Sequence, residues 1–241
     1  GFAAGRNGIA NGGETRGRRS QAMTRPASRT DGARWWTENR PDRPWWTRPE
    51  LFFQNRIRTI GVSSFPRHPA PWFYHVWHEF RQPQEPEEAM TVEWGHVSFQ
   101  TPRAAAVVDE SIDALERTDG DFFLYAQFWD PHAPYNRSEE QIDRFRGECP
   151  HPYPTSKQLE RHRGWDAVRS AAHTGIEARE DLAELIATYD AEVRYADRHS
   201  GRLLDHLRGA GQYDDTLIVL MGDHGEEFGE HGLYREHWST H

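Results

Sequence analysis

The sequence is poor in cysteine, with Cys149 as its one thiol among 241 residues. A single cysteine cannot form an internal disulfide, and it excludes a zinc site that is built from several cysteines. No evident base lies beside Cys149 in the sequence, so we do not assign it as a nucleophile. The chemistry of this chain therefore has to come from other residue types.

Long apolar runs and an excess of positive charge are also missing. No stretch of about 18 consecutive apolar residues occurs, so we expect no membrane-spanning helix. The first residues do not have the pattern of a signal peptide. The formal net charge is -9, which disfavours non-specific binding of nucleic acid because that binding needs a basic surface. We favour a soluble, cytoplasmic protein, although a signal peptide ahead of these residues would change that assignment.

Apolar residues are scarce for a complete, compact enzyme of this length. Hydrophobic residues make up 36% of the sequence, and the mean hydropathy is -0.93. The chain begins without Met and ends on Thr240-His241, directly after its densest motif. A chain of this length is long enough for one large α/β domain. We expect such a domain, truncated at both ends.

The sequence divides into an irregular segment and a core. Residues 1–48 are rich in Gly, Arg and Trp and have almost no apolar periodicity, which is typical of irregular structure. Residues 49–241 have the pattern of an α/β core. A polar insertion that carries short helices interrupts this core at about residues 138–179.

Within the core, the apolar pattern predicts helices and strands in alternation. The most regular element is a long amphipathic helix over residues 180–207, where apolar residues recur at steps of three and four. Another helix opens at Thr101-Pro102, because Thr is a favoured cap and Pro a favoured first residue, and it closes at Asp119-Gly120. The remaining elements are a short helix over residues 49–55, strands over 58–62, 122–128 and 217–221, and a long surface loop up to Met90.

The densest group of polar residues follows the last predicted strand. Residues 217–221 are apolar, and Gly222, Asp223, His224 and Gly225 come directly after them. Carboxylate oxygen and imidazole nitrogen are ordinary ligands of divalent cations, and open α/β sheets bind ligands at the carboxyl ends of their strands. The alternative is a strand that ends in a polar, glycine-rich turn. Further acids and histidines nearby favour a site.

A second histidine, His132, follows the strand predicted over residues 122–128. It lies between Pro131 and Pro134, and these prolines stiffen its loop. A lone histidine after a strand is more often structural. However, the helix ahead of residues 217–221 allows both strands to lie parallel in one sheet. We therefore expect His132 to share a crevice with Asp223 and His224.

A basic pair, Arg67 and His68, follows the strand predicted over residues 58–62. Charged groups placed after a strand can hold an anionic oxygen. The spacing alone slightly favours the alternative that both are solvated charges in a loop.

Three segments together resemble the sulfatase family of the alkaline phosphatase superfamily. They are residues 122–135, which contain Asp130-Pro131-His132, residues 189–197, and residues 213–232, which contain Asp223-His224-Gly225. Residues 5–9 also resemble the Gly-Arg segment that follows the family's nucleophile motif. The resemblance covers most of the chain, and the three segments are specific in their order and spacing.

The resemblance implies a largely parallel sheet flanked by helices, and hydrolysis of sulfate esters with one divalent cation. Calcium is the usual metal of the family, with magnesium or manganese as alternatives. Asp223 and His224 would be metal ligands, and His132 would hydrogen-bond the sulfate or the leaving-group oxygen. His224 stands where many sulfatases have Asn, whereas related phosphonate monoester hydrolases and alkaline phosphatases have Asp-His.

Several features of the family are missing from this sequence. The Asp-Asp metal pair and the Cys/Ser-x-Pro-x-Arg nucleophile motif are absent, so we expect these residues alone to be inactive. The family's Gly-Lys-x-His segment reads Gly61-Val62-Ser63-Ser64 here, and Arg67 or His68 would supply the missing charge. The later lysine of the family falls near Glu236, which makes His237 the nearest candidate cation.

The resemblance therefore implies a sulfatase-like, metal-dependent hydrolase whose substrate is a small-molecule or saccharide sulfate ester. A phosphodiester or phosphonate monoester hydrolase uses the same scaffold and is the first alternative. A relative that binds a metal or an anion without catalysis is the second. The sequence leaves the oligomeric state open.

Overall fold

The computed structural model of the protein describes residues 48–64, 76–84, 90–94, 97–148, 176, 178–229 and 234–236. Its centre is a three-stranded sheet that consists of β1 (Arg58–Ser63), β2 (Glu79–Arg81) and β5 (Phe122–Gln127). The central strand β1 pairs in parallel with both neighbours, and Ile60 lies opposite Glu79 on one side and Leu124 on the other. The predicted largely parallel sheet is confirmed.

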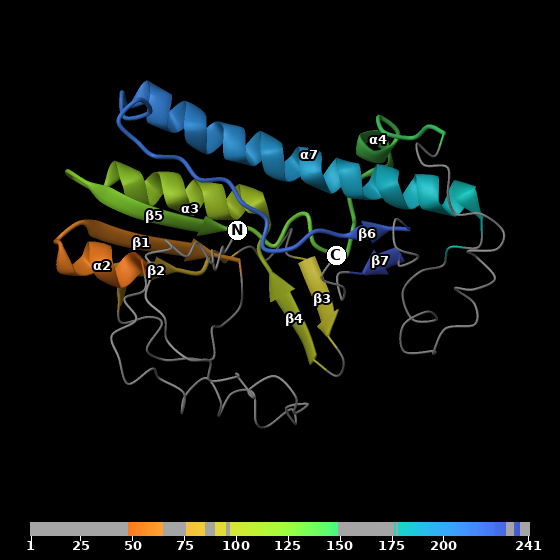
Figure 1. Ribbon diagram of the computed structural model, residues 1–241, viewed down its shortest axis with the longest axis horizontal. Coiled ribbons are helices and arrows are strands. Elements are labelled where there is room, and N and C mark those ends of the chain that lie inside the picture. The colour runs from red at the N-terminus through yellow and green to blue at the C-terminus, as the bar shows by residue number, and fades with distance from the viewer. Residues whose placement is uncertain are drawn as a thin grey trace, which may run out of the picture.

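Two long helices lie in successive layers over this sheet, as Figure 1 shows. Helix α3 (Ala104–Glu116) packs against β1 and β5, and helix α7 (Arg179–Gly209) packs against α3. The short helix α2 (Arg48–Gln54) contacts β1, and the Phe52 ring stacks on Phe123 with 4.7 Å between ring centroids. The predicted helices flanking the sheet are therefore present.

The alternation of side chains along β1 divides the two faces of the sheet. Ile60 and Val62 are fully buried and pack with Val107 and Ala114 of α3, which forms the core between the sheet and that helix. Gly61 points to the other face. A Cβ atom at Gly61 would lie 2.5 Å from the ring of Phe80, so the close approach of that ring requires glycine here.

One of the smaller elements lies against the amino-terminal half of α7. Helix α4 (Glu139–Ile142) packs there through Ile142, which shares a buried cluster with Ala187 and Ala191. The remaining elements are the antiparallel pair β3 (Met90–Trp94) and β4 (Val97–Thr101) and the antiparallel pair β6 (Glu227–Phe228) and β7 (Tyr234–Glu236). After α7 the chain runs back along the molecule to β6 (Figure 1).

Four predicted elements are confirmed with small shifts of their ends. The long amphipathic helix spans Arg179–Gly209, and the short helix spans Arg48–Gln54. The two early strands occupy Arg58–Ser63 and Phe122–Gln127.

The strand predicted over residues 217–221 is wrong. The structure assigns no strand to these residues, and their side chains face solvent, with Leu217 90% and Leu220 82% exposed. The sequence allows these residues to lie parallel to the strand at residues 122–128 in one sheet. Within the described part of the chain, however, β5 forms the edge of its sheet.

Two further predictions need correction. The helix expected to open at Thr101-Pro102 begins at Ala104, because Thr101 ends β4 and its hydroxyl donates a hydrogen bond to the carbonyl of Ser64 at 2.5 Å. The long surface loop expected up to Met90 contains strand β2.

Of the predicted irregular segment 1–48, residues 1–47 lie outside the described residues, and Arg48 begins α2; most of the insertion at 138–179 also lies outside them. Of the helices that the structure describes, none is long and apolar enough to span a membrane.

Candidate functional site

The loop after β5 holds His132 through contacts among its own residues. The backbone N–H of His132 donates to the carbonyl of Trp129 at 2.9 Å, and the Trp129 indole N–H donates to the carbonyl of Ala133 at 2.9 Å. The two rings pack together with 4.6 Å between their centroids. His132 is therefore fixed by the fold of residues 129–133.

The same loop sets the tautomer of His132. Its Nδ1 atom lies 2.8 Å from the carbonyl oxygen of Ala133. Because a carbonyl only accepts hydrogen bonds, Nδ1 carries the proton, and the neutral ring presents a lone pair at Nε2. This is the arrangement of an imidazole that exchanges a proton or binds a cation through Nε2.

Asp223 and His224 form a second polar group on the chain that returns from α7. The backbone N–H of His224 donates to Oδ1 of Asp223 at 3.1 Å, and Nε2 of His224 lies 3.9 Å from that same oxygen. Nδ1 of His224 donates to the carbonyl of Gly225 at 3.1 Å, so here too the lone pair of the neutral ring is at Nε2. Both side chains are partly open to solvent, at 55% and 37% exposure.

The two groups approach each other in space. The rings of His132 and His224 meet edge to face, with 5.7 Å between their centroids and an angle of 81° between their planes. The structure thus brings together three residues that the sequence places on separate segments. They meet although residues 217–221 form no strand.

Tyr125 on β5 is a neighbour that the sequence did not single out. Burial raises the pKa of its hydroxyl above the usual range, and the negative charge of Asp223 raises it further. A neutral phenol thus lies within electrostatic range of the Asp223 carboxylate. Tyr125 stands two positions after Phe123 in an apolar strand, and only this alternation could have indicated it.

Asp130, two residues before His132 in the same loop, has a fully buried side chain. Its Oδ2 atom accepts a hydrogen bond from the backbone N–H of Ala104 at 2.8 Å. Asp130 therefore caps the amino end of α3 and lies away from solvent.

The donors at Asp223 and His224 fit a divalent cation. One carboxylate oxygen and one imidazole Nε2 lie on the same short turn, and the Nδ1 hydrogen bond to a backbone carbonyl is the usual support of a metal-binding histidine. Across the residues that the structure describes, no three His, Cys, Asp or Glu side chains are grouped closely enough to hold a metal. The pair would therefore be part of a larger ligand set.

The remaining candidates lie outside the described residues. They are Arg67, His68 and His237, together with Cys149.

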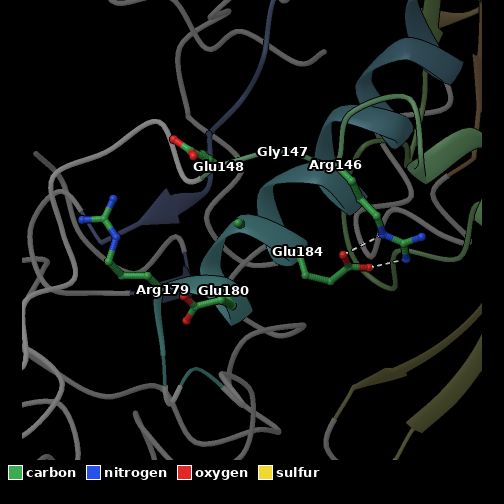
Figure 2. Close-up of a pocket in the computed structure, with 7 residues that line it drawn as sticks. Arg146, Gly147, Glu148, Arg179, Glu180 and Glu184 are labelled. Carbon is green, nitrogen blue, oxygen red and sulfur yellow. Dashed lines mark hydrogen bonds and ion pairs between the residues drawn. The ribbon is translucent and has the colours of Figure 1, made fainter.

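A pocket lies at the amino end of α7 (Figure 2), and His132, Asp223 and His224 are not among the residues that line it. Arg146 and Glu184 face each other across one side of it, with hydrogen bonds of 2.8 Å and 2.6 Å. Its lining carries both signs of charge, contributed by Arg146, Glu148, Arg179, Glu180 and Glu184. This mixture does not form an anion site.

The sequence is similar to several known proteins. A family model described as Sulfatase matches residues 32–241. An arylsulfatase from Clostridium perfringens is 32% identical over 149 residues, which cover 59% of this chain and 30% of the relative. A multifunctional alkaline phosphatase superfamily protein from Trinickia caryophylli is 30% identical over 141 residues, which cover 52% of this chain and 27% of the relative. The chain thus spans less than a third of the length of these relatives.

A solved structure shares the fold. It shows a protein in complex with its substrate D-glucosamine-2-N,6-O-disulfate, and it matches with a TM-score of 0.54 and 17% identity over 77% of this chain and 51% of the other. The predicted alkaline-phosphatase-like fold is confirmed by this likeness.

Proposed function

Since the chain belongs to the sulfatase family, we propose that the whole protein hydrolyses sulfate esters with a divalent cation held in part by Asp223 and His224. Members of this family generally use a divalent metal, and calcium is the first candidate here, with magnesium or manganese as alternatives. The observation that carries the proposal is the approach of the His132 ring to the His224 ring beside Asp223.

Cleavage of a sulfate ester leaves negative charge on the departing oxygen, and the site has to stabilise that charge. His132 suits this task, because its Nδ1–H is committed to the carbonyl of Ala133 and Nε2 is the nitrogen that can serve the ester. In the protonated ring Nε2 donates to the leaving oxygen, and in the neutral ring it accepts a proton. His132 therefore acts as the acid that assists departure.

In this proposal Asp223 and His224 hold the divalent cation, and the backbone around them fixes the orientation of both side chains. The hydrogen bond from the His224 backbone N–H to Asp223 fixes the carboxylate, and the Gly225 carbonyl fixes the imidazole. A divalent cation held in part by Asp223 and His224 would supply positive charge that polarises the ester oxygen and favours a deprotonated nucleophile. Arg67, His68 and His237 are further proposed cations for the sulfate group.

Sulfated saccharides are the substrate class to test alongside aryl sulfates. The solved neighbour of the same fold carries a glucosamine disulfate, and the matched arylsulfatase acts, by its name, on aryl esters. Both substrates share the same reacting group.

The test uses the full-length protein freed of metal by a chelator. Calcium, magnesium or manganese is then added, and aryl sulfate hydrolysis is followed together with metal binding by calorimetry. We expect Asp223→Ala to lower metal affinity by about 100-fold or more and to abolish turnover. The control is Asp215→Ala, which removes an exposed acid on the same returning chain. Unchanged activity in Asp223→Ala would exclude Asp223 from the reaction.

Phosphonate or phosphodiester hydrolysis is the second candidate, because the Trinickia caryophylli relative is named as a multifunctional protein of the alkaline phosphatase superfamily and His224 follows Asp223. An aryl phosphonate monoester is assayed beside the aryl sulfate under the same conditions. A higher kcat/KM for the phosphonate would replace the sulfatase proposal. Metal binding without turnover of either ester would indicate a relative that binds without catalysis.

A further inference from the structure

Four charged side chains form a buried group beneath the loop that carries His132. They are Arg103, Asp130, Arg137 and Glu192, and we call them the ion cluster. Their side chains are 8%, 0%, 7% and 1% exposed. Charges withdrawn from water to this degree are costly unless they are paired, so their arrangement needs a reason beyond general stability.

The first half of the ion cluster attaches the start of the loop to α3. Asp130 accepts the backbone N–H of Ala104 at 2.8 Å, which fills a donor at the first turn of that helix. Its other oxygen lies 3.6 Å from Arg103 and 4.0 Å from Arg137. The residue two positions before His132 is therefore anchored to α3.

The second half attaches the end of the loop to α7. Glu192 accepts the backbone N–H of Asn136 at 2.8 Å, and its other oxygen lies 3.0 Å from Nε of Arg137. The guanidinium of Arg137 also stacks on the Tyr195 ring at 3.9 Å. Arg103 closes the group by donating to the side chain of Asn136.

His132 lies between these two anchors. Its hydrogen bonds to Trp129 and Ala133 stay within the loop, so the ring follows wherever the loop is held. Helices α3 and α7 pack on each other, and a loop fastened to both has a fixed position relative to the returning chain with His224.

We propose that the ion cluster positions His132: it clamps residues 130–136 between α3 and α7 so that the His132 ring faces His224. Its catalytic consequence rests on the proposed function, whereas its structural consequence does not. Asp130, Arg103, Arg137 and Glu192 are positioning residues, since they act on the reaction through His132 alone.

Two variants loosen the clamp at opposite ends. Glu192→Gln keeps the shape of the side chain but replaces one of its two acceptor oxygens with an NH₂ group. An NH₂ group only donates, so either Asn136 or Arg137 loses its acceptor. Asp130→Asn does the same at the α3 anchor. Both are isosteric, so packing around the cluster is retained.

The matched control is Asp109→Asn. Asp109 pairs with Arg202 at 2.5 Å and also joins α3 to α7, but it is exposed and does not touch the loop. This control shows whether an effect comes from a weaker contact between α3 and α7 or from release of the loop that carries His132.

Two readouts are taken on the full-length protein. The first is amide hydrogen exchange of residues 130–136 together with the nuclear magnetic resonance signal of the His132 ring. We expect exchange to accelerate about tenfold or more in both cluster variants, with the same displacement of the His132 signal, and neither change in Asp109→Asn. The second is sulfate ester hydrolysis, where kcat should fall about 10-fold to 100-fold while KM is kept.

The outcomes separate the two proposals. If the His132 signal and loop exchange stay at wild-type values while the melting temperature falls, the ion cluster is only structural and the positioning role is overturned. If the loop loosens as expected but the wild-type protein turns over no sulfate ester, the proposed function fails and the clamp stands. Should one cluster variant not fold, the variant at the opposite end decides.

Discussion

The imidazole of His132 meets the imidazole of His224 edge to face, with 5.7 Å between the ring centroids. Each ring donates from Nδ1 to a backbone carbonyl of the following residue, Ala133 in one case and Gly225 in the other. The two histidines are therefore held in the same tautomer by the same local device. Their proposed roles differ, because only His224 adjoins the Asp223 carboxylate.

This difference in neighbours predicts different losses on substitution. His224→Ala should weaken binding of calcium or manganese by about 10-fold to 100-fold, since a ligand is removed. His132→Ala should leave metal affinity within about twofold but lower kcat by about 100-fold, as expected for the loss of an acid group. Calorimetric titration and steady-state kinetics on the full-length protein measure both.

The control for both substitutions is His206→Ala, near the carboxyl end of α7. It should change neither metal affinity nor kcat. Equal loss of metal affinity in His132→Ala and His224→Ala would contradict the separate roles and make His132 a ligand.

The exposed apolar run over residues 217–221 leads to a prediction about stability. Leu220 is 82% exposed, so Leu220→Ser should change the free energy of unfolding of this chain by no more than about 0.5 kcal/mol. Leu182 in α7 is fully buried, and Leu182→Ala should cost about 2–5 kcal/mol. Urea denaturation followed by circular dichroism compares them. A cost for Leu220→Ser that approaches that of Leu182→Ala would mean that the run is covered.

The sequence predicts those elements whose signal is local. Leu182 and Leu185 recur at helical spacing in α7, and the short apolar runs of β1 and β5 end in turns, so helix and strand follow from neighbouring residues alone. Residues 217–221 have the same local signal. A strand, however, needs a partner for its backbone hydrogen bonds, and in the described part of the chain β5 pairs only with β1.

The candidate site also has a part that the sequence predicts and a part that it does not. The types of residue at His132, Asp223 and His224 indicate their chemistry, because acid and imidazole after apolar runs are typical of ligand sites. The buried orientation of Asp130 could not be predicted, since it depends on Arg103 and Ala104 from another part of the chain. Sequence patterns report composition along one segment, and burial of a charge is decided by contacts between segments.

Because the Phe80 ring lies close to β1, a methyl group at Gly61 should destabilise the fold. Gly61→Ala would place Cβ 2.5 Å from the Phe80 ring and 3.2 Å from Trp77, so we expect a loss of about 1–3 kcal/mol in the free energy of unfolding. Gly201→Ala in α7 is the matched control. Among the residues that the structure describes, no atom beyond the helix's own backbone lies within 4 Å of the place its methyl carbon would take, and the substitution should stabilise by about 0.5–1 kcal/mol. Thermal melts that gave both substitutions the same sign would contradict this packing.

Arg81 on β2 predicts how the fold responds to acid. Its guanidinium bonds Asp113 and Glu110 of α3 and Glu79 of its own strand, which joins the sheet to the helix. The hydrogen bond from Arg81 lowers the pKa of Asp113, against a smaller opposing effect of burial. A carboxyl whose pKa is lowered by folding contributes stability above its ordinary pKa and loses it as the pH falls through the folded value. The stabilisation by Asp113 should therefore be complete above about pH 3.8 and be lost progressively as the pH falls below that value.

Arg81→Met removes this pH dependence while it keeps much of the buried length of the side chain. We expect the variant to be less stable than wild type at pH 7, and the difference to narrow as the pH is lowered below about pH 3.8, because the Asp113 carboxyl of wild type takes up a proton as the pH falls through its lowered pKa. Arg144→Met is the control, since it removes an exposed pair with Glu140 that holds no two elements together. Unfolding free energies from urea titrations at about pH 7, 5, 4 and 3 provide the measurement. A difference between Arg81→Met and wild type that stays constant across that series would show that Arg81 acts through packing, and that its bond to Asp113 contributes nothing to the joint between β2 and α3.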